Sequence, residues 1–166
     1  QALQLSLDKF GPAIRWHLRG HSEGALLALF LFDDLLATDP ALAQHVKTLI
    51  LSGLPLEPAA DNTRRQLADH PELARAVETC DWAVMRQVGV SCAYLRDAEQ
   101  RPSGRAMFER LAARSPGVRI RVFAGNADVN TPASFVRELE AWNAAQGHLD
   151  LAVRYNAGAP GGTPAV

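Results

Sequence analysis

Four runs of apolar residues along the chain predict β-strands. They occupy residues 13–19, 46–53, 118–125 and 149–158, and each is followed by glycine, by proline or by a change of pattern. The second run, VKTLILSG, contains an unbroken stretch of leucine and isoleucine, which is typical of a strand buried on both faces of a parallel sheet. We therefore expect a sheet built from these four segments.

Helical patterns alternate with these runs. In residues 23–37 the apolar positions run nearly all round the helix, which predicts a helix packed beneath other elements. Pro40 suits the first position of a short helix that extends to Val46. Residues 131–147 begin with a Thr-Pro pair and end at glycine, as a third helix would. The opening QALQLSLDKF mixes helical and alternating spacing, so its period is ambiguous.

Residues 56–116 carry no regular strand pattern. Asn62, Pro71 and Ser103 mark candidate helix starts there, and the segment is too long for a plain connection. The order of strands and helices predicts an α/β fold, with a parallel sheet flanked by helices and a helical insertion. We expect a core over residues 1–55 and 117–166, interrupted by a cap or lid over residues 56–116.

Composition narrows the classes of partner. The 166 residues are 48% hydrophobic and 21% charged, as in an ordinary globular domain, and the formal net charge is −1. With no concentration of basic residues, nucleic acid and anionic membrane are not expected as main partners. The longest apolar run, residues 24–32, is too short to span a bilayer. Cys80 and Cys92 lack metal-ligand spacing, so no metal site is expected, and their pairing stays open because it depends on the redox compartment.

The stretch RGHSEGA, residues 19–25, contains the candidate catalytic serine. Ser22 lies between Gly20 and Gly24, where a predicted strand meets a predicted helix. A tight turn at this junction lifts a serine hydroxyl above the sheet edge and directs the Glu23 N–H toward the oxyanion that forms after attack. The alternative is a serine that caps a buried helix, with glycines that are incidental.

Three segments resemble the α/β-hydrolase family: RGHSEGA as its nucleophile turn, LILSGLP as the next strand, and VFAGNADVNTP as its acid loop. The resemblance to the C-terminal part of that fold implies a serine hydrolase acting on an ester, amide or thioester of a small molecule or peptide. It implies Ser22 as nucleophile and Asp128 as the acid that orients a histidine. No cofactor is expected, because the nucleophile belongs to the protein. Asp128 also has a simpler explanation, since aspartate is common in turns before helices.

The base is missing from its expected place. The family has a histidine beside a glycine after the last strand, and Ala159 follows Gly158 here. The chain's five histidines are His17, His21, His45, His70 and His148, and none occupies that position. Either the histidine lies beyond Val166, or it has been replaced at Ala159, or the protein is a non-catalytic binding or scaffold protein of the same fold.

The sheet itself suggests a missing neighbour. In the family the nucleophile strand is central, and the three later strands all lie on one side of it. We therefore expect earlier strands, from an absent N-terminal segment or a second chain, to cover its other edge. Two pairs of charged side chains, Asp33 with Asp34 and Arg64 with Arg65, are expected to be solvated.

Overall fold

The computed structural model describes residues 2–58, 61–62, 65, 67–81, 83–84, 86, 92–114, 117–125, 128, 131–146 and 149–156. In chain order its elements are α1 (Ala2–Phe10), β1 (Trp16–His21), α2 (Glu23–Thr38), α3 (Pro40–Ala43), β2 (Val46–Ser52), α5 (Pro71–Thr79), α7 (Cys92–Gln100), α8 (Gly104–Arg114), β3 (Arg119–Gly125), α9 (Ala133–Gln146) and β4 (Asp150–Asn156). Among the described residues, no helix combines the length and the apolar character needed to cross a membrane.

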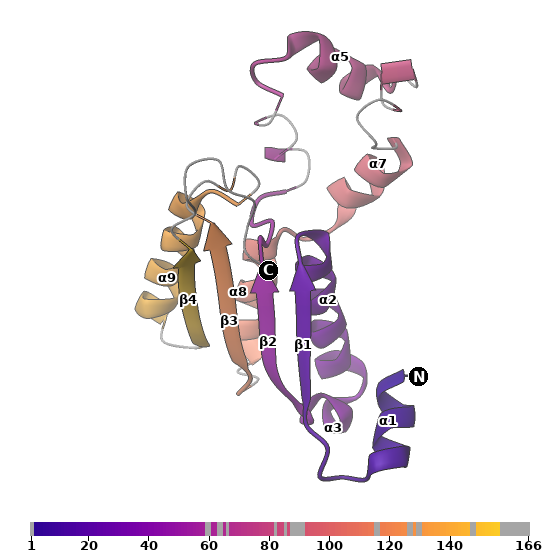
Figure 1. The fold of residues 1–166 in the computed structure, drawn as a ribbon, viewed down its shortest axis with the longest axis vertical. Helices are drawn as coiled ribbons and strands as arrows, with labels where there is room; N and C mark the ends of the chain where they lie inside the picture. Colours follow the sequence, from indigo (N-terminus) through magenta and orange to yellow (C-terminus); the bar gives the residue numbers. More distant parts are fainter. Residues whose placement is uncertain are drawn as a thin grey trace.

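The four strands form one sheet, parallel throughout, in the order β1-β2-β3-β4 (Figure 1). One row of register partners runs Leu18, Leu49, Ile120 and Leu151. The predicted α/β class with a parallel sheet is confirmed. So is the expectation that the three later strands lie on one side of β1, whose other edge pairs with no described strand.

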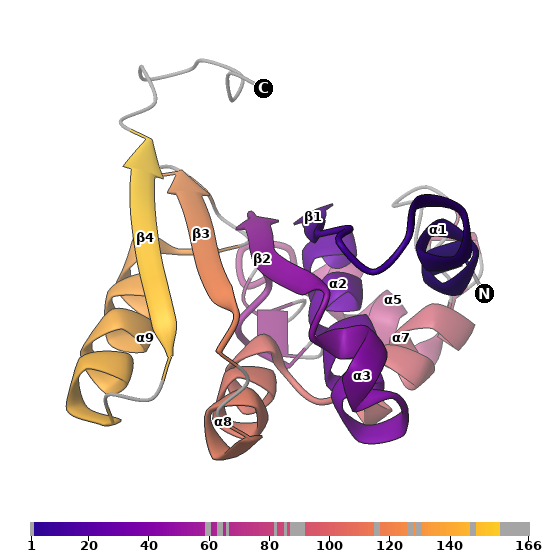
Figure 2. The ribbon, with the colours of Figure 1, turned by 90° about the horizontal axis from the view of Figure 1, so that it is seen from below.

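Helices α2, α8 and α9 cover one face of this sheet (Figure 2). The core forms between these helices and the strands, where Leu29, Phe32, Leu49, Phe108 and Ile120 are almost completely buried. Each large apolar side chain buried in this way stabilises the fold by about 1.5–3 kcal/mol relative to exposure.

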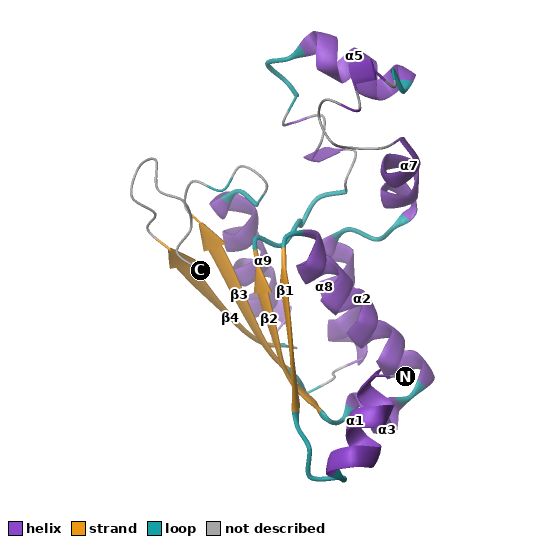
Figure 3. Cartoon of the chain, turned by 45° about the vertical axis from the view of Figure 1, so that its right-hand side comes forward, coloured by secondary structure: helices purple, strands orange, loops and turns teal. Residues whose placement is uncertain are grey.

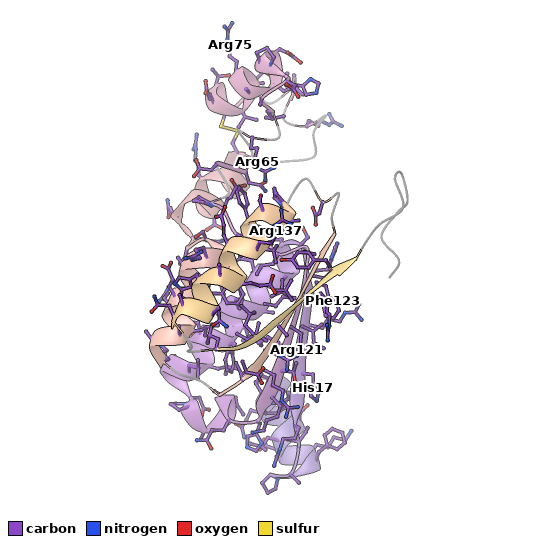
Figure 4. The ribbon with its side chains drawn as sticks, turned by 90° about the vertical axis from the view of Figure 1, so that its left-hand side faces the viewer. His17, Arg65, Arg75, Arg121, Phe123 and Arg137 are labelled. Carbon is purple, nitrogen blue, oxygen red and sulfur yellow. A yellow bond between two sulfur atoms is a disulfide. The ribbon has the colours of Figure 1, made fainter. Side chains whose placement is uncertain are left out.

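The opposite face of the sheet is uncovered in the described part of the chain. Burial alternates along β2, so Thr48, Ile50 and Ser52 are only half-buried. The prediction of a strand buried on both faces is therefore wrong for β2, because the described helices that pack on the sheet share one side. His17, Arg121 and Phe123 lie on the uncovered face, turned away from α9 (Figure 4).

Two expectations about α2 are also wrong. Leu27 and Leu31 are 51% and 44% exposed, so the helix is not buried all round. The carboxylate of Asp33 is buried rather than solvated, because Arg114 (2.8 Å) and Arg110 (3.4 Å) of α8 pair with it. Asp34, the next residue, is exposed as expected.

The start of β1 differs from the prediction for a local reason. The strand begins at Trp16 rather than at residue 13. The Arg15 guanidinium donates hydrogen bonds to the carbonyl oxygens of Pro12, Ala13 and Ile14. These carbonyl groups therefore do not need a neighbouring strand as hydrogen-bond partner. The ambiguous opening forms α1, which lies beside the outer edge of β1 (Figure 2).

The segment between β2 and β3 leaves the carboxyl edge of the sheet and returns to it. Helices α5 and α7 lie beyond the carboxyl ends of the strands, whereas α8 packs on α2 (Figure 3). The helix starts predicted at Pro71 and Ser103 are confirmed, and the Ser103 hydroxyl accepts a hydrogen bond from the Ala106 N–H (3.2 Å).

Two side-chain questions in this segment are answered. Cys80, at the end of α5, forms a disulfide with Cys92, the first residue of α7. Arg65 is not simply solvated, because its guanidinium pairs with Glu57 at 2.8 Å. Arg64 lies outside the described residues.

Candidate active site

The turn at Ser22 joins β1 directly to α2. Its backbone has φ 54° and ψ −127°, and its N–H donates to the carbonyl oxygen of Ser52 at 2.8 Å. A Cβ on Gly20 would collide with the backbone of Gly24, so this crossing requires glycine at position 20. A Cβ on Gly24 would meet nothing within 4 Å. Of the two glycines that flank Ser22, only Gly20 is therefore required by the packing of the turn.

The Ser22 side chain does not cap α2. It makes no capping hydrogen bond and it is exposed. The first bond into the helix is the one that the Ala25 N–H donates to the Ser22 carbonyl oxygen (2.9 Å). The Glu23 N–H precedes this bond and belongs to the unsatisfied donors of a helix N-terminus. The capping explanation for Ser22 is thus not supported, and the geometry fits an exposed hydroxyl beside an N–H donor.

Asp128 follows β3 at the same edge of the sheet. Its Oδ1 accepts the Thr131 N–H at 3.1 Å, which is the turn hydrogen bond that the simpler explanation predicts. Thr131 is buried, and its hydroxyl donates to the carbonyl oxygen of Leu54 at 2.9 Å. One carboxylate oxygen of Asp128 therefore binds Thr131, which is itself bound to the chain that follows β2.

Gly53 lies between the two candidate regions. Its φ is +55°, and a Cβ built there would stand 3.4 Å from Asp128 Oδ2 and 3.4 Å from His21 Cε1. The carboxylate and the imidazole thus flank the same point. His21 Nδ1 is also 3.2 Å from Ser52 Oγ. The carboxyl ends of β1, β2 and β3 bring His21, Ser52 and Asp128 together, at the sheet edge where α/β proteins bind ligands.

The other described histidines lie elsewhere. His17 is exposed on the uncovered sheet face, and His45 Nδ1 is 3.1 Å from the Ile14 carbonyl oxygen, just before β2 begins. His70 precedes α5 and lies 3.7 Å from Glu72. Of the four histidines in the described residues, His21 alone stands at the carboxyl edge of the sheet. His148 and Ala159 lie outside the described residues.

Sequence reasoning missed the partners of the site. Ser52 and Gly53 end an apolar strand, which was the available signal that they reach the carboxyl edge. No sequence pattern marks Arg101 as part of the site, yet its Nη1 lies 2.9 Å from Oε1 of Glu23. Glu23 is the residue after Ser22. The other terminal nitrogen of Arg101 pairs with Asp97 of α7. Within the described residues, no group of three or more His, Cys, Asp or Glu side chains is placed to hold a metal ion.

Comparison of this chain with known protein families, with curated proteins and with solved structures found no match.

Proposed function

We propose that this chain is a serine hydrolase of the α/β-hydrolase type that cleaves an ester, amide or thioester of a small molecule or peptide. The observation that carries the proposal is the Ser22 turn. A serine with positive φ, an exposed hydroxyl and no capping bond stands at the carboxyl edge of a parallel sheet. Strained backbone clusters at functional sites, so a strained serine at this edge supports a catalytic role.

The roles follow from the chemistry of acyl transfer. The Ser22 hydroxyl oxygen attacks the substrate carbonyl carbon, and its proton passes to a base. The carbonyl oxygen becomes an oxyanion, which accepts a hydrogen bond from the Glu23 N–H. Loss of the leaving group gives an acyl-serine, and water releases the acid product. No cofactor takes part in this sequence.

Asp128 is assigned to orient the base and to stabilise its charged form. Its carboxylate accepts the Thr131 N–H, and Thr131 is bound to Leu54, which supports a preorganised carboxylate at this edge. No residue of this chain is assigned as the base, because Ala159 takes the place where the family has histidine.

The surrounding elements fit the same proposal. Helices α5 and α7 stand beyond the sheet edge that carries Ser22 and Asp128, where a cap would enclose the substrate (Figure 1). The last helix of the predicted cap at residues 56–116 is α8, and it packs on α2 in the core instead. The outer edge of β1 has no partner among the described strands. An N-terminal segment or a second chain is proposed to complete the sheet there.

A fluorophosphonate probe tests the nucleophile. Such a probe bonds covalently to an activated serine, and digestion followed by mass spectrometry identifies the residue. We expect labelling at Ser22, loss of labelling in Ser22→Ala, and retained labelling in Ser52→Ala, the matched serine at the neighbouring strand end. Asp128→Asn should label at least tenfold more slowly, since an amide does not stabilise a cationic base. Labelling that persists in Ser22→Ala, or that heat denaturation leaves unchanged, would contradict the assignment.

A binding or scaffold protein of the same fold is the second candidate. The alanine at position 159 favours it, because a chain that lacks the catalytic base keeps the Ser22 turn but cannot turn over a substrate. The same experiment separates the two functions. A folded chain that the probe never labels would contradict the hydrolase and favour the binding or scaffold protein.

A further inference from the structure

Arg101 links the insertion to the Ser22 turn. It immediately follows α7, and its guanidinium bridges two carboxylates, Glu23 of α2 and Asp97 of α7. The side chains of Arg101 and Glu23 are 31% and 35% exposed, so the pair is partly shielded from solvent. These two residues are 78 positions apart in the sequence, and the fold alone brings them together.

The backbone that carries Arg101 is anchored on the core. Gly104 packs so closely on the carbonyl of Pro55 that a Cβ there would collide with it. The Arg105 N–H donates to the carbonyl oxygen of Leu56 at 3.2 Å. The outgoing and returning ends of the insertion thus lie against each other. In contrast, neither α5 nor α7 packs extensively on another described element. The position of the guanidinium is therefore set by the anchored return segment.

The ion pair between Arg101 and Glu23 affects the proposed reaction through the charge of Glu23. The N–H of Glu23 is the proposed oxyanion donor, and the same residue carries a carboxylate. An unpaired negative charge on that residue opposes the negative charge that develops on the substrate oxygen. A guanidinium at 2.9 Å offsets it.

We propose that Arg101 is a positioning residue that neutralises the Glu23 carboxylate beside the oxyanion position. This inference rests on the proposed function, because it concerns the rate at which Ser22 reacts. Arg101 acts through Glu23 and does not touch the substrate.

The rate of fluorophosphonate labelling measures this effect directly. In that reaction Ser22 Oγ bonds to phosphorus, fluoride leaves, the hydroxyl proton passes to the base that Asp128 is proposed to orient, and negative charge develops on the phosphoryl oxygen. Arg101→Gln should label about tenfold more slowly than wild type, since it exposes the Glu23 charge at short range. Arg101→Lys, which keeps the charge, should retain most of the rate. Arg105→Gln is the matched control on the same segment, where Arg105 pairs with Glu109 instead, and its rate should equal that of wild type.

A double variant separates charge from structure. Glu23→Gln combined with Arg101→Gln removes both charges and should restore the labelling rate, although it leaves the ion pair broken. A purely structural bridge would leave this double variant as slow as Arg101→Gln. Glu23→Gln alone removes the carboxylate beside the oxyanion position and leaves Arg101 paired with Asp97, so it should label faster than wild type. This single variant tests the charge effect even where Arg101→Gln fails to fold, which a circular-dichroism melt would reveal.

The outcomes distinguish the two proposals. Wild-type labelling at Ser22 with an equal rate in Arg101→Gln overturns the role of Arg101 and leaves the proposed hydrolase intact. A slower Glu23→Gln, or a double variant that is not rescued, also overturns the role of Arg101 alone. Absence of labelling in wild type overturns both.

Discussion

The backbone of Ser22 occupies a region that residues with a side chain rarely adopt. With φ at 54° it carries a strain of about 1–2 kcal/mol. The turn persists because its neighbours hold it. The Ser22 N–H is bound to Ser52, and Gly20 allows the backbone of Gly24 to cross close by. The strained backbone of Ser22 thus lowers the stability of the fold, and it lies at the position where the proposed chemistry needs an exposed hydroxyl.

Replacing Ser22 by glycine should therefore stabilise the protein while it removes the nucleophile. Ser22→Gly relieves the strain, although the flexible unfolded chain offsets part of the gain. We expect it to be more stable than Ser22→Ala by about 1 kcal/mol, measured by urea unfolding. Neither variant should react with the fluorophosphonate. A Ser22→Gly protein that is less stable than Ser22→Ala would show that this backbone is not strained.

Tyr155 offers a test by pH. Burial, together with the hydrogen bond that its hydroxyl donates to Glu140 Oε2 (2.6 Å), raises the pKa of Tyr155 from 10.0 to about 12. Folding therefore favours the neutral phenol. Its stabilising contribution is complete below pH 10.0 and is lost as the pH rises toward about 12.

Glu140→Gln should lower the Tyr155 pKa, because the variant removes the neighbouring negative charge. The pKa should stay above 10.0, since burial, the largest cause, remains. Phenolate absorbance during an alkaline titration measures this value, and Tyr155→Phe identifies which transition belongs to Tyr155. An unchanged transition in Glu140→Gln would show that the contact with Glu140 does not form.

At the level of elements, the junction of β1 and α2 depends on one glycine rather than on two. Gly20→Ala forces a Cβ into the backbone of Gly24, whereas Gly24→Ala places one in open space at the start of a helix. We expect Gly20→Ala to lose at least about 2–3 kcal/mol of unfolding free energy. Gly24→Ala should change it by less than about 1 kcal/mol. Thermal and urea unfolding of the two variants side by side measure this difference, and equal losses would contradict the geometry.

How far the sequence predicts these elements depends on the range of the interactions that form them. β2, β3 and α2 begin within a residue or so of their predicted positions, because apolar period and glycine stops are local signals. The nucleophile turn is local in the same sense. Contacts between distant segments leave no such signal. Helix packing brings Glu23 to Arg101 and buries Asp33 against α8. No short sequence pattern predicts how these helices pack.

The uncovered sheet face is another feature that local patterns do not predict. The leucine and isoleucine run of β2 indicates burial on both sides, yet Ile50 is only half-buried because the described helices that pack on the sheet lie on one face. Parallel sheets are ordinarily covered on both faces. Among the described residues, the sheet therefore has both an uncovered face and an unpaired strand edge, at β1.

At the scale of the whole molecule, that edge should drive self-association of residues 1–166. The Ser22 N–H points to β2, where it binds Ser52, so in the alternation of a strand the N–H groups of residues 17, 19 and 21 point outward. These unpaired donors form a template for another strand. We expect the weight-average mass in sedimentation equilibrium to rise with protein concentration.

Proline at the edge provides the decisive variant. Arg19→Pro removes an outward N–H and no hydrogen bond of the sheet, so it should lower association while the four strands stay paired. Arg19→Val is its matched control, because it also removes the charge but keeps the N–H, and it should associate at least as strongly as wild type. Were wild type monomeric at every concentration, the β1 edge would not be an association surface. Were both variants to associate equally, the contact would lie on the uncovered face and not on the edge.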